Sequence, residues 1–285
     1  MKRNGRITGG IRDLLPGLVL PAVVLAAWHL STTRGLVPPL IPTPAAVVRV
    51  LASPGTDLLS SGSLLWNTAI SLVRVVSGFA IAAAIGIPLG ILMGSSRLAR
   101  RLMSLSVELS RPLSPLALVP LSLVVFRSRS LVHVLGLTAL RYRQHILHEI
   151  QPGMLFVLFW GGFFPILLGT MAGVRSVRKQ HLEAARILGA GRLFMLRHVH
   201  LPSAIPDIFT GLKLGMGRCW MVIIAAEMLP GTNSGLGYLV KYSYDVHRLD
   251  VMFAGIALIG VLGALLSLGL SSMSEWRTRL RVEER

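Results

Sequence analysis

The chain has 285 residues, of which 53% are hydrophobic and only 14% are charged, whereas soluble domains carry about 25% charged residues. Lys and Arg outnumber Asp and Glu by 29 to 12, but aromatic residues are only 6%, so a surface for stacking nucleic-acid bases is poorly supplied. The basic residues fall between long apolar runs, and we interpret the net charge of +17 as membrane topology, with no nucleic-acid partner. The single cysteine, Cys219, excludes an intramolecular disulfide and a zinc site built on several cysteines.

Six apolar runs predict an all-α fold, a polytopic membrane helical bundle of about six transmembrane helices. A span needs about 20 mostly apolar residues. The runs cover residues 14–30, 69–94, 105–126, 154–174, 208–229 and 251–272. Arg111, Pro112, Pro115 and Pro120 interrupt the third run, which predicts a kinked helix that packs against protein rather than lipid.

Small residues crowd the second, fifth and sixth runs, where they would allow helix backbones to approach closely. They include Ala82, Gly86, Gly211, Gly215, Gly217, Gly260 and Gly263. Packing within a bundle is the simpler explanation, and a direct role in a pore is the alternative.

The distribution of Lys and Arg predicts that both termini are cytoplasmic. With six spans, the cytoplasmic segments are 1–13, 95–104, 175–207 and 273–285, and the last two are rich in arginine. The first run follows a basic stretch and lacks a small-residue cleavage site, so we expect it to be an uncleaved span.

The connection 127–151 breaks this charge rule, because it holds four arginines and three histidines against Glu149 although the topology places it outside. Leucines at roughly helical spacing favour an interfacial amphipathic helix. The histidines suggest a metal-binding or pH-sensing site. No acidic or cysteine partner completes a set of metal ligands, so we predict no metal.

The connection 175–207 carries helical signals of its own. Good helix formers from 180 to 188 precede Gly189, which predicts a helix end, and a second short helix is expected over 192–199, ending before Pro202. A solvated connection is the alternative, but this stretch is longer than most structureless loops. We expect a compact helix-turn-helix that projects from the membrane towards a soluble partner.

These residues resemble the EAA motif of permease subunits in ABC importers. The motif here reads Glu183-Ala184-Ala185, then Gly189, and nine residues later Val199-His200-Leu201-Pro202. In that family the loop forms the coupling helices that dock into a cleft of the ATP-hydrolysing subunit. The resemblance therefore implies an ATPase-coupling role for Glu183, Ala184, Ala185, Gly189, Leu201 and Pro202.

More narrowly, the chain resembles the permeases of the nitrate, taurine and alkanesulfonate import group. The matching stretches are 111–120, 162–168, 225–229 and 234–238. The resemblance implies a single transmembrane permease domain over 1–285, with a family-like core at about 66–273 and the coupling loop at 175–207. The segment 127–151 departs from the family pattern, and it is either an external elaboration or a stretch of shifted reading frame.

The resemblance also implies partners and a location. Two copies in the bacterial plasma (inner) membrane, surrounded by lipid, would form a path for a small anionic solute such as an alkanesulfonate, taurine or nitrate. Cytoplasmic ABC ATPase subunits would bind the ATP, and an extracytoplasmic solute-binding protein would deliver the solute. The alternative solute is a vitamin precursor or amino acid. The rival class is an ATP-independent secondary transporter, although the chain shows no convincing inverted repeat.

Motifs for catalysis are absent from the sequence. It has no P-loop for nucleotide phosphates, no Gly-x-Ser-x-Gly and no His-Glu-x-x-His. We therefore expect no catalytic residues and no cofactor in this subunit, which is not an enzyme.

Four ionisable residues fall inside the apolar runs, where insertion of a charge costs about 3 kcal/mol. Arg74 and Glu227 lie at similar depth near the outer ends of their runs, so we expect an ion pair between them, more structural than gating, and restored by a swap of both charges. Lys213 lies near the inner end, where it can reach the cytoplasm. Arg218 lies near the midplane, and it either attracts the anionic solute or bonds to carbonyls of the broken helix around 112–120.

Overall fold

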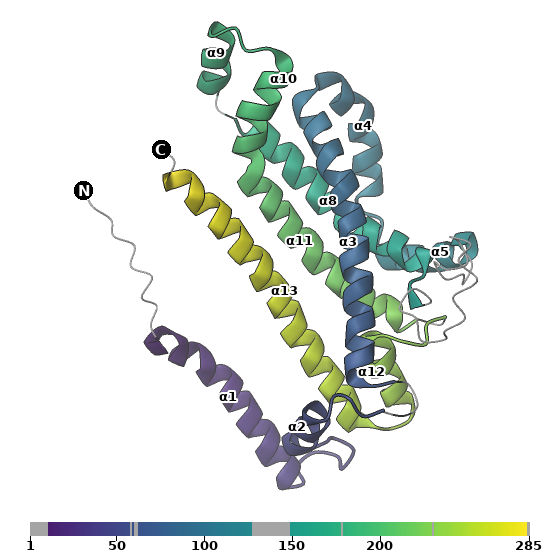
Figure 1. Cartoon of the computed structure of the whole chain (residues 1–285). Helices are drawn as coiled ribbons and strands as arrows, with labels where there is room; N and C mark the ends of the chain where they lie inside the picture. Colours follow the sequence, from purple (N-terminus) through teal and green to yellow (C-terminus); the bar gives the residue numbers. More distant parts are fainter. Residues whose placement is uncertain are drawn as a thin grey trace.

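The computed structural model describes residues 11–57, 59, 62–126, 149–177, 179–229 and 231–283, and these are almost entirely helical (Figure 1). An isolated bridge between Asp57 and Ser63 is the only β-type pairing in the described residues. The all-α prediction is confirmed.

The helices of the described residues follow one another along the chain. They are α1 (Ile11–Thr33), α2 (Pro44–Ala52), α3 (Leu64–Ser95), α4 (Arg97–Ser110), the 3-10 turn η1 (Pro115–Leu118), α5 (Val119–Phe126), α8 (Pro152–Arg175), α9 (Lys179–Ile187), α10 (Arg192–Met195), the π-helical turn η2 (Leu196–His200), α11 (Leu201–Glu227), α12 (Leu236–Asp245) and α13 (Leu249–Glu283). Figure 1 shows α9 and α10 at one end of the molecule, and α2 and α12 at the opposite end. We call these the α9 end and the α12 end.

Four described helices are long and apolar enough to cross a membrane, and there are up to five such spans if the bent pair of α4 with η1 and α5 counts as one. The four are Leu64–Ser95, Pro152–Arg175, Leu193–Glu227 and Leu249–Met273. They coincide with the second, fourth, fifth and sixth predicted runs. The first predicted run lies on α1, whose apolar part Val19–Thr33 is shorter than a span in the described chain. The predicted count of six spans is therefore not confirmed.

The third predicted run is two helices and not one kinked helix. The helix α4 and the η1–α5 segment meet at an angle of 86°. Pro115 begins η1, and because proline lacks an N–H and restricts the residue before it, the helix cannot continue through this point. On α5, Val119 and Ser122 are buried whereas Val124 is 78% exposed, so the expected packing against protein holds for one face only.

Small residues bring α3 and α11 into close contact with α8, and the sequence predicts such residues on α3 and α11 but not on α8. A Cβ on Gly169 of α8 would lie 2.8 Å from the Cα of Gly211 on α11, and one on Gly215 would lie 2.8 Å from a side chain of α8. Gly217 and Gly260, in contrast, have no heavy atom of another segment within 4 Å of such a Cβ. Close approach therefore accounts for some of the predicted glycines but not for these two.

Two N-terminal helices are joined to the bundle through α13. Val47 and Val50 of α2 are buried in the main core, and Trp28 of α1 stacks on Phe253 of α13 with ring centroids 5.4 Å apart. Other large apolar side chains of α1 are exposed, including Leu20 at 72%. Such a surface suits a helix that lies in lipid.

Candidate functional site

A group of polar side chains, all buried except the partly exposed Glu149, lies at the α12 end of α3 and α11. We call Arg74, Glu227, Ser71, Ser234 and Glu149 the polar cluster. Arg74 of α3 is completely buried, yet each of its five N–H donors meets an acceptor. Its Nη1 donates to Glu227 Oε1 and to the Ser234 carbonyl, both at 2.9 Å, and its Nη2 donates to Ser234 Oγ at 3.0 Å. Its Nε and Nη2 also donate to the Glu149 carbonyl, at 2.9 and 2.6 Å.

Glu227, the last residue of α11, is the buried counter-charge of Arg74. Its carboxylate accepts the hydroxyl of Ser71 at 2.8–2.9 Å and the N–H of Gly237 at 3.1 Å. Removing two charges from water is costly, and a buried pair is tolerated when its remaining hydrogen-bonding groups are satisfied. Both partners meet that condition here.

The connection between α11 and α12 is shaped around the same carboxylate. Gly235 has φ +110°, and a Cβ at this position would overlap the Glu227 carboxylate, so only glycine fits. The Gly235 N–H donates to Asn67 Oδ1 at 2.8 Å, and the Leu236 N–H donates to Ser71 Oγ at 2.8 Å. The polar cluster therefore joins α3, α11 and the start of α12.

The ion pair of Arg74 with Glu227, predicted from depth alone, is confirmed at 2.9 Å. Sequence reasoning missed Ser71, Ser234 and Glu149. Ser71 lies one helical turn before Arg74, and this spacing could have revealed it. Ser234 lies in the stretch 234–238, whose sequence indicates only the family resemblance. Its hydroxyl donates to the Glu149 carboxylate.

Most of the segment 127–151 lies outside the described residues, and with it the predicted amphipathic helix and the three histidines. Its last residues are described, and Gln151 donates from Nε2 to the Gly231 carbonyl at 3.0 Å. Among the described residues no group of three or more His, Cys, Asp or Glu could hold a metal ion.

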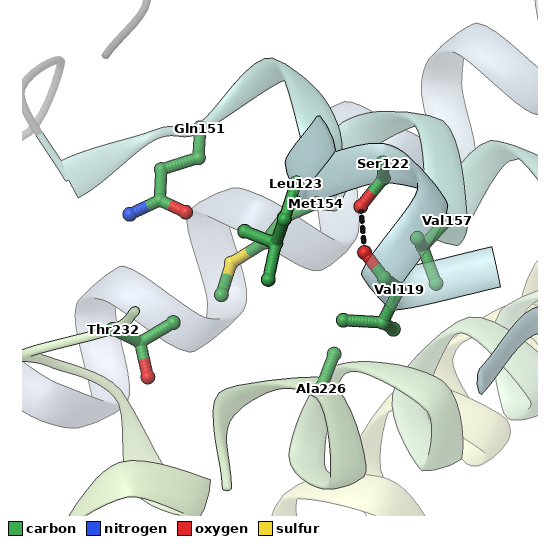
Figure 2. A pocket seen from close by; sticks show the side chains of 8 residues that line it. All are labelled: Val119, Ser122, Leu123, Gln151, Met154, Val157, Ala226 and Thr232. Atoms are coloured by element: carbon green, nitrogen blue, oxygen red, sulfur yellow. Dashed lines mark hydrogen bonds between the residues drawn. The ribbon is translucent and has the colours of Figure 1, made fainter. Parts of the chain in front are cut away.

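A small pocket lies beside the polar cluster, and its walls come from α5, α8, α11 and the α11–α12 connection (Figure 2). The lining residues are Val119, Ser122, Leu123, Gln151, Met154, Val157, Ala226 and Thr232. The Ser122 hydroxyl donates to the Val119 carbonyl at 2.7 Å, and the free space suffices for about one water molecule. The pocket cannot serve as a chamber for an organic solute.

The other two charges of the fifth run lie on exposed faces of α11. Lys213 and Arg218 are both exposed, and the neighbouring Leu214 and Met221 are 59% and 66% exposed. Residues 112–120 are described, and none of their carbonyls accepts a hydrogen bond from Arg218. No other described residue bonds to its side chain. In the described chain Arg218 therefore does not make the bonds to the broken helix that one interpretation expects, and its contact with an anionic solute stays a prediction.

At the α9 end, residues 179–200 form a helical elbow that consists of α9, α10 and η2. The helix α9 ends in a Schellman motif: Gly189 has φ +78° and donates to the Arg186 carbonyl at 2.9 Å, and the Ala190 N–H reaches the Ala185 carbonyl at 3.0 Å. The predicted helix of 180–188 and its glycine stop are thus present, with Lys179–Ile187 as the observed bounds.

The second half of the elbow differs from the prediction. The expected helix of 192–199 does not end before Pro202, because α10, η2 and α11 follow one another without a break. Pro202 lies in the first turn of α11, where its missing N–H is tolerated, and the preceding π-helical turn changes the hydrogen-bond spacing before it. His200 anchors this turn, since its Nδ1 lies 3.1 Å from the Val174 carbonyl at the end of α8.

The elbow exposes large apolar side chains on the segment that joins α8 to α11. Ile187 and Leu188 are 85% and 86% exposed, Leu193 is 77% exposed and Phe194 is 54% exposed. Glu183 and Ala184 of α9 are exposed as well, whereas Ala185 is half-buried. A cluster of exposed apolar side chains with charges at its rim is typical of a protein interaction site.

Residues 86–279 match the family described as "Binding-protein-dependent transport system inner membrane component". The chain belongs to this family. It is a permease subunit of an ABC importer, which makes it a transport component and not an enzyme. The family implies an ATPase and a binding protein as partners and the inner membrane as the location.

Several permeases are similar to this one along nearly the whole chain. It is 40% identical to a putative ABC transporter permease protein of Methanocaldococcus jannaschii, over 95% of each chain. It is 34% identical to the taurine transport system permease protein TauC of Escherichia coli, over 88% of this chain and 84% of the relative. It is 31% identical to the bicarbonate transport system permease protein CmpB of Synechococcus elongatus, over 98% of this chain and 97% of the relative.

The fold is also similar to a solved structure, the inward-facing MetNI methionine ABC transporter in its native crystal form. The TM-score is 0.60 at 18% identity, and the match covers 75% of this chain and 97% of that chain. At this identity the likeness shows the fold alone.

Proposed function

We propose that two copies of this permease form a translocation path for a small anionic solute of the taurine, alkanesulfonate or nitrate type. The relatives named for a solute give support, because taurine carries a sulfonate and bicarbonate is itself an anion. The pocket beside the polar cluster is too small for an organic solute, which favours a path between copies. Arg218 supplies a cation on the exposed face of α11 that this arrangement would turn towards the path.

The elbow is the docking surface for the ATPase. The observation that carries this proposal is the exposure of Ile187 and Leu188, two large apolar side chains on the segment that joins α8 to α11. Glu183, Ala184 and Ala185 offer a small face with a charge beside it, and Gly189 ends the helix so that the chain can turn back. Leu201 and Pro202 form the junction that passes the motion to α11.

The continuous helix that begins at Leu193 is the transmitting element. Its 35 residues reach from the elbow to Glu227 and span about 50 Å at 1.5 Å per residue. At the far end the polar cluster joins it to α3, and along its length it packs closely on α8. A displacement of the elbow therefore moves α3, α8 and α11 together, and the path opens or closes between copies.

In this arrangement the α9 end and both termini are cytoplasmic, and the α12 end faces the solute-binding protein. The arginine-rich elbow and C-terminal segment support this orientation. The ion pair of Arg74 with Glu227 stabilises the outer end of the bundle and does not act as a gate.

The test is reconstitution of the permease with its ATPase and solute-binding protein, followed by uptake and solute-stimulated ATP hydrolysis. We expect stimulation by one of taurine, ethanesulfonate, nitrate or bicarbonate, and none by a neutral or cationic amino acid. Stimulation only by an amino acid that lacks a sulfonate, or by a cationic solute, would contradict the anion proposal, whereas uptake without ATP would contradict the ATPase coupling.

A further inference from the structure

A basic groove at the α9 end is lined by residues of the elbow and of the turn that joins α3 to α4. Figure 1 shows the elbow and this turn at the same end of the molecule. It offers about 800 Å³ of open space. Arg97, Arg186 and His200 line it together with Ser95 and Ser96, and the Ser95 hydroxyl donates to the Ile91 carbonyl of its own helix. None of these groups belongs to the polar cluster, and α3, α4, α9 and η2 each contribute at least one of them.

The groove carries positive charge without a counter-charge. No carboxylate is among its lining residues, and in the described part of the chain neither Arg97 nor Arg186 forms an ion pair or a side-chain hydrogen bond. Both side chains are exposed, so their donors are available to a ligand. The contact of His200 Nδ1 with the Val174 carbonyl fixes its ring at the edge of the groove. Two guanidinium groups that line one groove in this way suit an oxyanion.

The groove also lies where the apolar spans meet water. Ser95 is the last residue of one membrane-spanning helix, and the span Leu193–Glu227 begins inside the groove. A stripe of exposed leucines leads away from it along α4, with 64–71% of each side chain exposed. The stripe consists of Leu98, Leu102, Leu105 and Leu109. These positions recur every three or four residues and therefore share one helix face.

We propose that this groove binds a phosphate group, which can come from the headgroup of an anionic phospholipid or from free inorganic phosphate. A headgroup would place its phosphate between Arg97 and Arg186 and its acyl chains along the leucine stripe of α4. Basic pockets at the cytoplasmic side of membrane helices suit such headgroups. The bound phosphate bridges the elbow and α4, so it restrains the elbow relative to the bundle. This inference goes beyond the proposed transport function and does not depend on the solute.

The experiment uses the full-length chain in nanodiscs that contain phosphatidylglycerol and phosphatidylcholine, with native mass spectrometry to measure the lipid retained after extraction. We expect preferential retention of phosphatidylglycerol, reduced roughly tenfold by Arg97→Gln and by Arg186→Gln, the loss expected for one charge-assisted contact. Arg49→Gln on α2, which removes one exposed charge at the opposite end, is the matched control and should retain the lipid.

A second arm titrates inorganic phosphate into the delipidated protein. Binding of phosphatidylglycerol but not of phosphate assigns the site to a headgroup, and binding of phosphate with the same dependence on Arg97 shows that the free ion suffices. The proposal is overturned if neither binds, or if the two groove variants behave as Arg49→Gln does. It is also overturned if addition of the ATPase subunit displaces the ligand, because the groove would then belong to the ATPase interface.

Discussion

The two ends of α11 differ in whether their neighbouring side chains are buried or exposed. At the α12 end, Arg74 and Glu227 are completely buried and their donors and acceptors are satisfied by neighbouring segments. At the α9 end, Ile187 and Leu188 are more than four-fifths exposed although they are apolar. One end is complete within a single chain, and the other presents a surface that needs a partner.

This difference indicates that a partner can displace the elbow more easily than the polar cluster. A buried charge pair that is fully hydrogen-bonded fixes one geometry, because any displacement leaves a charge without a partner in a medium of low polarity. An exposed apolar surface has no such constraint before its partner arrives. Substitutions at the polar cluster should therefore affect folding first, and substitutions at the elbow should affect association.

The largest expected effect is loss of stability in Glu227→Ala. The change leaves the Arg74 guanidinium buried without its counter-charge, which costs about 3–5 kcal/mol of the free energy of unfolding. Thermal unfolding of the purified permease checks this prediction, with Glu108→Ala on an exposed face of α4 as the control. Equal unfolding temperatures for the two variants would show that the polar cluster does not stabilise the fold.

The charge swap Arg74→Glu with Glu227→Arg should not restore transport, contrary to the simple expectation from an ion pair. The groups around Arg74 are carbonyl acceptors of Glu149 and Ser234, whereas the Gly237 N–H faces Glu227. In the double variant a carboxylate would therefore face the two carbonyl acceptors, and a guanidinium would face the N–H donor of Gly237. Uptake by the double variant should stay as low as in each single variant, and full recovery would show that only the net charge matters.

A smaller effect is expected for Gly235→Ala, which keeps every charge. The new Cβ would overlap the Glu227 carboxylate and also strain a backbone with φ +110°, at a cost of about 1–3 kcal/mol. Gly260→Ala is the control, because nothing of another segment lies within 4 Å and φ is not positive. Chemical denaturation should separate the two variants, and equal midpoints would contradict the steric argument.

The smallest effect is expected for Arg218→Gln. Its side chain is exposed and bonds to no described residue, so the unfolding temperature should not change, whereas uptake of the anionic solute should fall roughly tenfold if one charge contact is lost. Lys213→Gln on the same helix is the control for loss of one charge. Normal uptake and normal solute-stimulated ATPase activity in Arg218→Gln would remove this residue from the path.

The sequence predicts the features that depend on composition and helical position. Depth along two runs suffices to pair Arg74 with Glu227, and helix formers followed by Gly189 suffice to place α9. The prolines between Arg111 and Pro120 predict a break, but the 86° bend depends on packing that no local pattern encodes.

The sequence does not predict features that depend on the backbone conformation of the connections between helices. The contacts of Arg74 with the Glu149 and Ser234 carbonyls require connections of one particular shape, and side-chain types alone do not specify that shape. The continuity of α10, η2 and α11 was missed because Pro202 is compatible both with a helix end and with a first helical turn. The ambiguity is resolved by the π-helical turn that precedes it.

The most direct test of the account is the affinity of the ATPase subunit for the permease in nanodiscs, measured for wild type and for Ile187→Ser with Leu188→Ser. Both side chains are exposed, so the variant should fold normally while its affinity falls about a hundredfold, the loss expected when an interface loses its apolar anchors. Leu36→Ser, 74% exposed and far from the elbow in sequence, should bind as wild type does. If the elbow variant binds the ATPase and supports uptake as well as Leu36→Ser, the elbow is not the coupling surface.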